Sequence, residues 1–248
     1  MTPFSLFKYL LQSGDVAIDA GAHIGSSTLP MADAVGPLEK VFAFAPQGFN
    51  FSRLCANVAL NGLTNVYPQC AALIANNQPR LAMPFVDYRG KVQSGYIQMY
   101  RHTKNIKEEQ IITTTLNDHI NLVRNATLLK IDVERYELEV LLGAKDLLKL
   151  NNLKFIYFES HNRNKFNEII ALLKTKNQYF EFYWHPSPIF DNPSFRGKSE
   201  DIYGGLGYSL NILAASEPFA PFPDLFYIKN HIKFLPENDF PEKIARKI

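Results

Sequence analysis

The sequence predicts an α/β fold, built on a mostly parallel β-sheet with helices on its faces. Short apolar runs of strand length alternate with segments of helical periodicity through the first two thirds of the chain. Strands that alternate with helices in this way form βαβ units, whose strands run parallel. A glycine-containing turn, from Asp19 to Gly25, separates the first apolar run from the first helical segment. Ligands of such sheets bind beyond the carboxyl ends of the strands, so we expect a site at that edge.

The size and composition fit one domain with its own core. The chain has 248 residues, of which 46% are hydrophobic and 20% charged, as in ordinary globular proteins. We therefore expect a single domain over residues 1–248. The formal net charge is only +2, which gives no strong attraction to nucleic acid or to anionic membranes, and we expect neither as a partner.

The chain also lacks the sequence signs of a membrane or secreted protein. No apolar run reaches the roughly 18 residues that a membrane span needs. The segment 1–11 has no basic region and no small-residue cleavage site, so we predict no signal peptide. Cys55 and Cys70 are too few for a disulfide framework or a metal cluster. They fit a reducing compartment, and we expect a cytoplasmic location.

The first half of the chain shows three apolar runs and two helical patterns. The patterns predict strands at 16–19, 40–44 and 66–71, and helices at about 24–35 and 49–60. Pro30 must then lie in the first turn of its helix or kink it. Asn61 and Gly62 are a stop signal for the second helix.

The second half continues the alternation and then becomes irregular. It predicts extended segments at 81–86, 95–99 and 111–114, strands at 128–132 and 155–159, and helices at 137–150 and 164–176. Turn signals such as His185-Pro-Ser-Pro then predict an irregular insertion on the substrate side, at about 184–208. Further extended segments are expected at 209–214 and 225–228, and a charged tail follows from 237.

Two carboxylates mark the end of the strand at 128–132. Asp132 and Glu134 are spaced i and i+2, so they lie on the same face if the strand continues. Two acids side by side repel each other, and such pairs often bind a cation, hydroxyl groups or a proton. The alternative is that Glu134 and Glu137 simply favour the dipole of the following helix.

The turn between Asp19 and Gly25 has the chemistry of a nucleotide cradle. Glycine adopts positive φ and lets a ligand approach the backbone, while N–H groups at the start of a helix face that ligand. The spacing Asp-x-Gly-x-x-x-Gly differs from the G-x-G-x-x-G of dinucleotide enzymes, which argues against a nicotinamide-dependent oxidoreductase. A glycine-rich turn of an unrelated α/β protein is the other interpretation.

Several blocks together resemble the FkbM-type family of S-adenosylmethionine (SAM)-dependent methyltransferases. They occur in the family's order over about residues 12–160: Asp19-Ala-Gly-Ala-His-Ile-Gly25, Val41-Phe-Ala-Phe-Ala-Pro46, Leu60-Asn-Gly-Leu63, Thr114-Thr-Leu-Asn-Asp118 and Lys130-Ile-Asp-Val-Glu134 with Glu137 and Gly143-Ala144. The resemblance implies a class I methyltransferase (Rossmann-like) fold, with a seven-stranded, mostly parallel sheet and helices on both faces. It also implies methyl transfer from SAM to a hydroxyl, often on a sugar or a polyketide.

The resemblance implies a set of cofactor residues. They are Asp19, Gly21, Ala22, His23, Gly25, Ala45, Pro46 and Asp132. The glycines let the methionine part of SAM approach. His23 stands where many class I enzymes have glycine, and it serves either as a turn residue or as a ligand contact.

Two residues depart from the family pattern. The family has Phe-Glu-Pro after the second strand, with an acid that binds the ribose hydroxyls, but this chain has Phe44-Ala45-Pro46. Losing that acceptor costs about 1.5–3 kcal/mol, which is roughly one to two decades in affinity. Gln47 is near enough in the sequence to replace the missing acid in part. Two other interpretations are that the cofactor binds weakly, or that the protein is an inactive binding protein with a methyltransferase fold. The second departure is Arg135, where the family has glycine.

Methyl transfer also needs an aligned acceptor and a base for its proton. We predict Asp132, Glu134 and His161 as catalytic residues. The predicted acceptor-binding residues are Arg135, Glu159, His185, Asn192 and Arg196. A metal site of Asp132, Glu134, Glu159 and His161 would require neighbouring strand ends to converge, and we expect no metal. The acceptor is expected to be a glycan or a small molecule.

Overall fold

The computed structural model describes residues 3–76, 78–85, 107–160, 163–176, 180–185, 211–216 and 233–234. The extended segments expected at 95–99 and 225–228, the insertion from 186 to 208 and the charged tail lie outside these residues. No helix among the described residues is long and apolar enough to cross a membrane.

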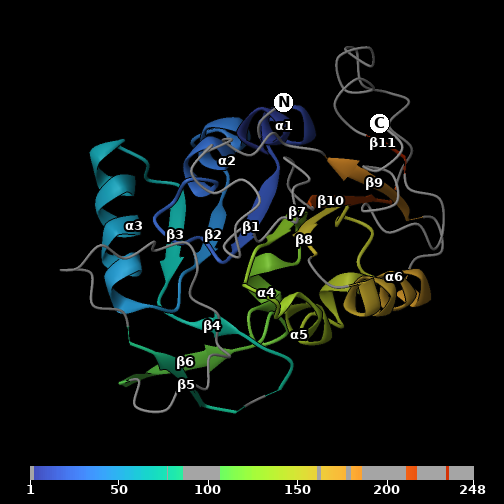
Figure 1. The fold of residues 1–248 in the computed structure, drawn as a ribbon. Coiled ribbons are helices and arrows are strands. Elements are labelled where there is room, and N and C mark those ends of the chain that lie inside the picture. The colour runs from blue at the N-terminus through green and yellow to red at the C-terminus, as the bar shows by residue number, and fades with distance from the viewer. Residues whose placement is uncertain are drawn as a thin grey trace, which may run out of the picture.

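A central sheet forms the middle layer of the fold (Figure 1). Its order in the described residues is β3-β2-β1-β7-β8-β10-β9-β11. The first five pair in parallel, and β10 runs antiparallel to β8 and β9. The strands are β1 (Val16–Ala20), β2 (Val41–Phe44), β3 (Val66–Gln69), β7 (Ala126–Ile131), β8 (Phe155–Glu159), β9 (Glu181–His185), β10 (Asn211–Ala215) and β11 (Lys233–Phe234). The predicted seven-stranded, mostly parallel sheet is therefore confirmed, and the two-residue β11 extends it at the β9 edge.

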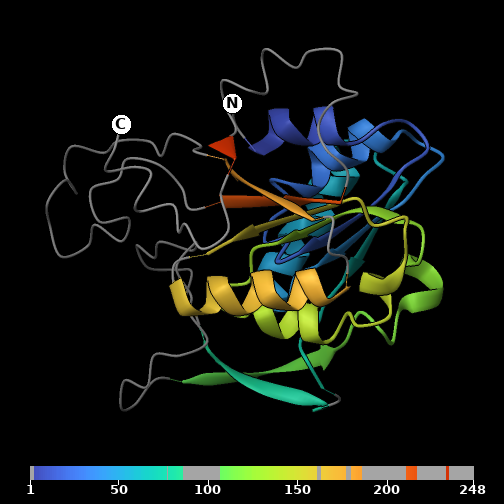
Figure 2. The ribbon, with the colours of Figure 1, turned by 90° about the vertical axis from the view of Figure 1, so that its right-hand side faces the viewer.

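Helices cover both faces of this sheet, as Figure 2 shows. The helices are α1 (Pro3–Leu10), α2 (Thr28–Val35), α3 (Gly48–Leu60), α4 (Ile120–Val123), α5 (Glu137–Leu142) and α6 (Arg163–Lys176), with a 3₁₀ turn at Leu147–Lys149. Successive strand residues point to opposite faces. One hydrophobic core accordingly contains Ile18 and Leu129 of the sheet together with side chains of α5 and α6. The other contains Ala17 and Leu128 together with side chains of α1, α2 and α3.

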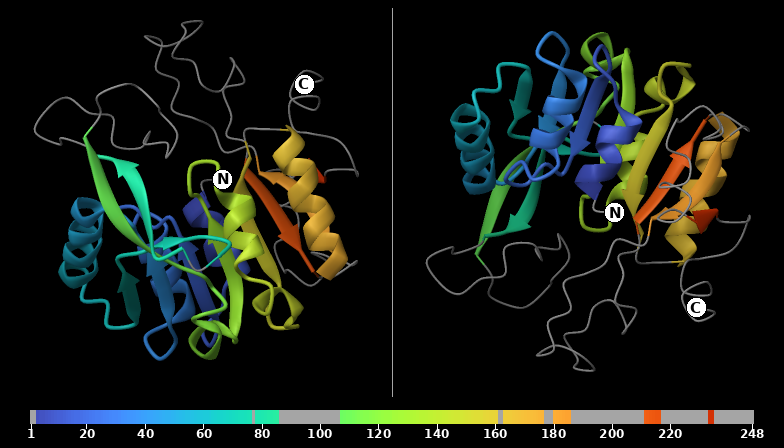
Figure 3. Two further views of the ribbon diagram at one scale, coloured as in Figure 1. Left: turned by 90° about the horizontal axis from the view of Figure 1, so that it is seen from below. Right: turned by 90° about the horizontal axis from the view of Figure 1, so that it is seen from above.

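A small second sheet lies beyond the carboxyl ends of β1, β2 and β3 (Figure 3). It contains β4 (Ala72–Leu73), β5 (Arg80–Pro84) and β6 (Glu108–Thr114), in the order β4-β6-β5. The strand predicted over 66–71 divides here: β3 ends at Gln69, and the chain then turns into β4, which pairs with β6. This sheet forms one side of the edge where a ligand was expected.

The helix predicted over 137–150 is shorter than its apolar pattern indicates. The α-helix ends at Leu142, and a Cβ on Gly143 would lie 2.1 Å from the carbonyl oxygen of Ile74. The chain therefore passes close to the β4 segment and turns there. Leu147 and Leu148 are nevertheless buried, so core packing explains the apolar spacing beyond the helix.

One further boundary and two whole elements differ from the sequence prediction. The first helix begins at Thr28 rather than near residue 24, because residues 24–27 belong to the turn; Pro30 lies in its first turn, as expected. The strand β9 and the helix α1 were not predicted. Trp184 and His185 are the end of β9 and not the start of the irregular insertion, and both are buried against the core.

Candidate functional site

The turn after β1 approaches the backbone that follows β7. Gly21 has φ 81°, and a Cβ at this position would lie only 1.8 Å from the carbonyl oxygen of Asp132. The amides of Gly21 and Ala22 both donate to the carbonyl of Phe44, at 3.1 and 2.8 Å. The amide of Asp132 donates to Ala20 at 3.0 Å. The turn is thus joined to both neighbouring strands, and position 21 requires glycine.

The rest of this turn is equally constrained. His23 and Gly25 have φ 51° and 99°. A Cβ on Gly25 would lie 2.7 Å from a Leu29 methyl group, so this glycine packs against the helix that it precedes. The side-chain amide of Asn57 donates to the carbonyl of Ile24 at 2.8 Å, which ties the turn to α3. The backbone conformation therefore exists before any ligand binds.

A buried ion pair supports the turn from below. The ammonium of Lys130 lies 3.0 Å from Asp19 Oδ1 and donates to the carbonyl of Gly21 at 3.0 Å. Thr28 Oγ1 donates to Asp19 Oδ2 at 2.6 Å. Burial opposes the charge on Lys130, but the attraction and hydrogen bonds of Asp19 and Asp132 outweigh it and raise the pKa of the amine. Lys130 is therefore a fixed cation, and Asp132 Oδ2 lies 3.6 Å from it.

The segment after β7 adopts an unusual backbone conformation. Glu134 and Arg135 are consecutive non-glycine residues with φ 54° and 81°, in the left-handed region. The amide of Arg135 donates to Glu137 Oε1 at 3.0 Å, and Lys165 Nζ donates to the Arg135 carbonyl at 2.6 Å. These contacts hold the segment in a strained shape beside the site.

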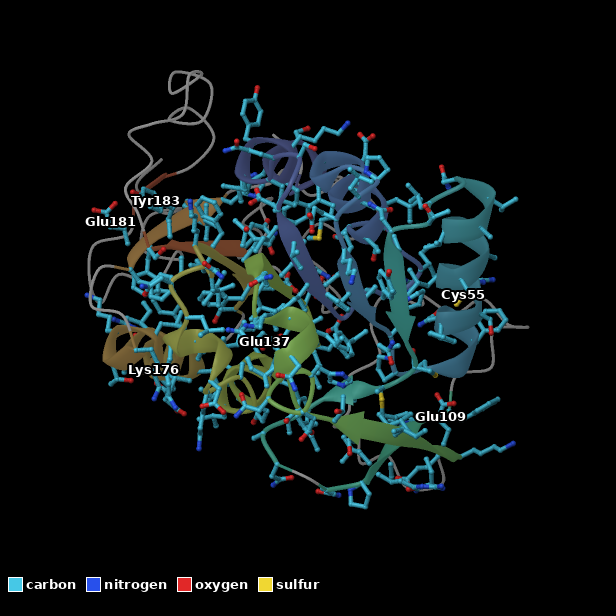
Figure 4. All side chains as sticks on the ribbon, turned by 180° about the vertical axis from the view of Figure 1, so that it is seen from behind. Cys55, Glu109, Glu137, Lys176, Glu181 and Tyr183 are labelled. Atoms are coloured by element: carbon cyan, nitrogen blue, oxygen red, sulfur yellow. The ribbon has the colours of Figure 1, made fainter. Side chains whose placement is uncertain are left out.

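The carboxyl group of Glu137 is buried beneath this segment, and Figure 4 shows Glu137 at the start of α5. Burial raises its pKa to about 7, which the hydrogen bonds from its own amide and from that of Arg135 only partly oppose. The negative charges of Asp132 and Glu159 raise it further. Glu137 thus changes its charge near neutral pH while it holds the Arg135 backbone.

These elements enclose a cavity of about 260 Å³ at the carboxyl ends of β1, β2 and β7. Its walls are the turn after β1, the segment from β2 into α3, the β3–β4 connection and the end of β7. The lining residues are Gly21, Ala22, His23, Ser26, Ser27, Phe44, Ala45, Pro46, Gln47, Asn50, Ala71, Ala72, Leu73, Met83, Lys130, Asp132, Val133 and Glu134. The cavity lies where an open α/β sheet binds its ligand.

A family model described as the methyltransferase FkbM domain matches residues 19–182, which is most of the chain and includes every wall of this cavity. The chain belongs to the FkbM methyltransferase family. The family is one of methyltransferases, and the methyl donor that the sequence resemblance implies for it is S-adenosylmethionine. The comparison with curated protein sequences gave no match.

Solved structures agree with the fold of an FkbM methyltransferase. An FkbM methyltransferase from Methylobacillus flagellatus KT has a TM-score of 0.54 and 14% identity, over 84% of this chain and 47% of that one. The present chain thus spans about half the length of that protein. A putative rRNA methylase from Clostridium thermocellum has a TM-score of 0.51 and 11% identity, over 86% of this chain and 92% of that one. At these identities the likeness concerns the fold alone.

The residues around this cavity fit the adenosyl cofactor on two observations. Gly21 lines the cavity with backbone that carries no side chain, so a ligand in the cavity can approach that backbone. The buried Oδ1 of Asn50 has no hydrogen-bond partner among the described residues, although Asn50 lines the cavity. A ligand with a hydroxyl or N–H donor would satisfy it.

The structure brings most of the predicted cofactor residues together. Those that line the cavity are Gly21, Ala22, His23, Ala45, Pro46 and Asp132. Asp19 and Gly25 do not line it: Asp19 is fully buried and holds Lys130, and Gly25 shapes the turn. They therefore shape the cavity only indirectly.

The predicted catalytic and acceptor residues are more dispersed. Asp132 and Glu134 line the cavity, whereas Arg135 and Glu159 do not. The residues His161, Asn192 and Arg196 lie outside the described residues.

The structure corrects the assignment of His185 to the acceptor side. Its imidazole is fully buried, and Nδ1 lies 2.8 Å from the hydroxyl of Tyr157. The residue belongs to the internal packing because β9 continues to residue 185. Burial is the main cause that raises the pKa of Tyr157, and the charges of Glu159 and Asp132 raise it further. The phenol of Tyr157 is therefore uncharged at neutral pH.

Sequence reasoning missed Lys130 and Asn50 as site residues. Lys130 could have been recognised, because a lysine within the apolar strand 128–131 must be paired when it is buried. Asn50 belongs to a block that carries the family resemblance, but it was not assigned to the site, because its position at the cavity depends on how α3 packs. Among the described residues no group of three or more His, Cys, Asp or Glu is placed to hold a metal ion.

Proposed function

We propose that the chain transfers the methyl group of S-adenosylmethionine to a hydroxyl of a sugar, a glycan or a glycosylated small molecule. The observation that carries the proposal is the position of two carboxylates, Asp132 and Glu134, on the wall of the cavity that the Gly21 turn also lines. The glycine turn and the two acids thus line one cavity. Methyl transfer requires this, because the methyl donor and the acceptor hydroxyl must lie side by side in order to react.

The bound cofactor supplies an electrophilic methyl group on a sulfonium, and the chain supplies the geometry. The Gly21 turn accommodates the donor without a conformational change in its own backbone. Lys130 is fixed by Asp19 and attracts Asp132, so the orientation of that carboxylate is restricted. The side chain of Asp132 is 48% exposed, which leaves it able to accept a proton from an incoming hydroxyl. Glu134 is the second candidate base.

Several residues that we assign to binding of the methyl acceptor lie outside the described residues. Arg135 and Glu159 are assigned to acceptor binding, together with His161, Asn192 and Arg196. Arginine and amide side chains suit sugar hydroxyls and acidic groups. We expect no nucleic-acid partner because the net charge is only +2. A cytoplasmic location is also part of the proposal, and it is supported by the two free cysteines, Cys55 and Cys70.

The test combines cofactor binding with methyl transfer. Titration calorimetry should show micromolar to millimolar binding of S-adenosylhomocysteine, and labelled SAM should transfer its methyl group to members of a sugar panel. Asp132→Asn should reduce turnover about a hundredfold or more, while the affinity for S-adenosylhomocysteine changes less than about threefold. Asp146→Asn, which removes a surface acid that pairs with Lys149, is the matched control. Equal turnover of the two variants would exclude Asp132 as the base.

A specific observation favours a second candidate, a binding protein that has lost catalysis. Ala45 is fully buried on the cavity wall, where the family pattern has the acid that binds ribose. If this candidate is correct, the wild-type chain binds no SAM at millimolar concentration, and Ala45→Glu restores binding. Micromolar binding by the wild-type chain would remove the basis for it.

A further inference from the structure

The side chain of Asn50 is deeply buried, and its oxygen Oδ1 accepts no hydrogen bond from the described residues. The residue is only 3% exposed, it lies in the first turn of α3, and it lines the cavity. Among the described cavity-lining residues, its Oδ1 is the buried side-chain oxygen that has no hydrogen-bond partner. An acceptor that is buried without a partner destabilises the protein, so a donor from a ligand is expected to satisfy it.

The orientation of the Asn50 amide is fixed by its neighbour. Asn50 Nδ2 donates to Gln47 Oε1 at 2.8 Å. This hydrogen bond uses the nitrogen end of Asn50 and leaves the oxygen end for the cavity. Gln47, at the start of α3, is itself 6% exposed and lines the same wall. The two amides therefore form a short chain with a defined direction.

A carboxylate lies at the other end of this chain. Glu109 of β6 is within hydrogen-bond reach of the Gln47 side chain, and Figure 4 shows Glu109 on the small sheet. Burial raises the pKa of Glu109, and the hydrogen bond from Gln47 partly lowers it. Since Oε1 of Gln47 already accepts from Asn50, Nε2 is the atom that it offers to an acceptor such as Glu109. Each bond in such a series polarises the next, which strengthens the acceptor at its far end.

The surrounding wall has the character of a nucleoside site. Phe44, Ala45, Leu73 and Met83 are buried apolar residues on the cavity wall, which suits a purine. Ala45 offers no side-chain acceptor for the two hydroxyls of a ribose. Asn50 Oδ1 is the buried acceptor that this wall presents instead.

We propose that Asn50 Oδ1 accepts a hydrogen bond from a ribose hydroxyl of the adenosyl cofactor, and that Gln47 and Glu109 position the Asn50 amide for this contact. The inference rests on the proposed function, because it requires the cavity to bind an adenosyl ligand. Asn50 is the ligand-binding residue, whereas Gln47 and Glu109 are positioning residues. The acid that binds ribose in the family is absent at position 45. In this proposal the carboxylate of Glu109 on β6 contributes instead, through the side-chain amides of Gln47 and Asn50.

The test is calorimetric titration with S-adenosylhomocysteine and with its 2′,3′-dideoxy analogue. Asn50→Ala should weaken binding of S-adenosylhomocysteine about tenfold and change binding of the dideoxy analogue less than about twofold. Glu109→Gln should weaken only the hydroxyl-bearing ligand, by a smaller factor of about three. Asn61→Ala, at the far end of the same helix, is the matched control and should change neither affinity.

The conservative variant Asn50→Asp keeps an oxygen acceptor at the same position. It loses the donor to Gln47 Oε1 but should still bind S-adenosylhomocysteine more tightly than Asn50→Ala does, which a purely structural role of Asn50 would not predict. Equal weakening of both ligands in Asn50→Ala, or no weakening of either, would overturn the inference and leave the proposed function intact. Failure of the wild-type chain to bind S-adenosylhomocysteine would overturn both.

Discussion

Replacing Glu137 with glutamine should change how the stability of the protein depends on pH. Glu137 is 6% exposed, and its pKa is raised from an ordinary 4.5 to about 7, chiefly by burial. A carboxyl group whose pKa is higher in the folded state stabilises that state most when it is protonated. Its contribution is therefore fully present below pH 4.5 and is lost as the pH rises through 7.

The size of the effect follows from the same pKa. One pKa unit corresponds to about 1.4 kcal/mol, so charging Glu137 costs the folded state roughly 3 kcal/mol above pH 7. Glu137→Gln removes this charge but keeps an oxygen that can accept from the amide of Arg135. The variant should thus unfold with a free energy up to about 3 kcal/mol above that of the wild-type chain at pH 8. The two proteins should agree within about 0.5 kcal/mol at pH 4, where the carboxyl group is mostly protonated in both states.

Urea denaturation at pH 4, 5, 6, 7 and 8 measures this directly. The wild-type free energy of unfolding should fall relative to that of Glu137→Gln across this range, with the steepest divergence midway between the two pKa values, at about pH 5–6. Parallel curves for the two proteins would refute the assignment of a raised pKa to Glu137. A variant that is less stable at every pH would instead show that the Arg135 contact needs a carboxylate.

Three further predictions concern the walls of the cavity. Gly21→Ala should abolish binding of S-adenosylhomocysteine in calorimetry and lower the melting temperature, because the new methyl group would overlap the carbonyl of Asp132; unchanged binding would exclude the close approach. Lys130→Met should lower the free energy of unfolding by about 3–5 kcal/mol, because Asp19 is left buried without its cation, and adding Asp19→Asn should recover part of the loss in urea melts. Arg135→Gly should raise the free energy of unfolding by about 0.5–1 kcal/mol, because φ 81° suits glycine, and a loss of stability would show that the left-handed backbone is not strained.

The mostly parallel arrangement of the central strands could be predicted from the sequence, because it depends on local patterns and on motifs in a recognisable order. Leu128, Leu129 and Ile131 are apolar on both faces, as a strand buried between two helical layers must be. The end of α5 could not be predicted in the same way. Its apolar spacing continues to Leu148, and only the tertiary contact between Gly143 and Ile74 shows why the helix stops.

The candidate site was predicted where it depends on chain-local motifs. Gly21 and Asp132 were both expected, since glycine turns and acids at strand ends have a characteristic chemistry. The left-handed backbone at Glu134 and Arg135 was not, because neither residue type favours it and the contact from Lys165 that holds it comes from another helix. Asn50 was missed for the same reason: its importance appears only when α3 is packed beside the cavity.

A structure of the protein crystallised with S-adenosylhomocysteine tests the central claim most directly. We expect the ligand inside the cavity, with its amino-acid part against the turn at Gly21, its ribose within hydrogen-bond distance of Asn50 Oδ1, and its sulfur facing the side where Asp132 and Glu134 lie. A ligand bound outside this cavity, or one whose sulfur faces away from both acids, would contradict the account.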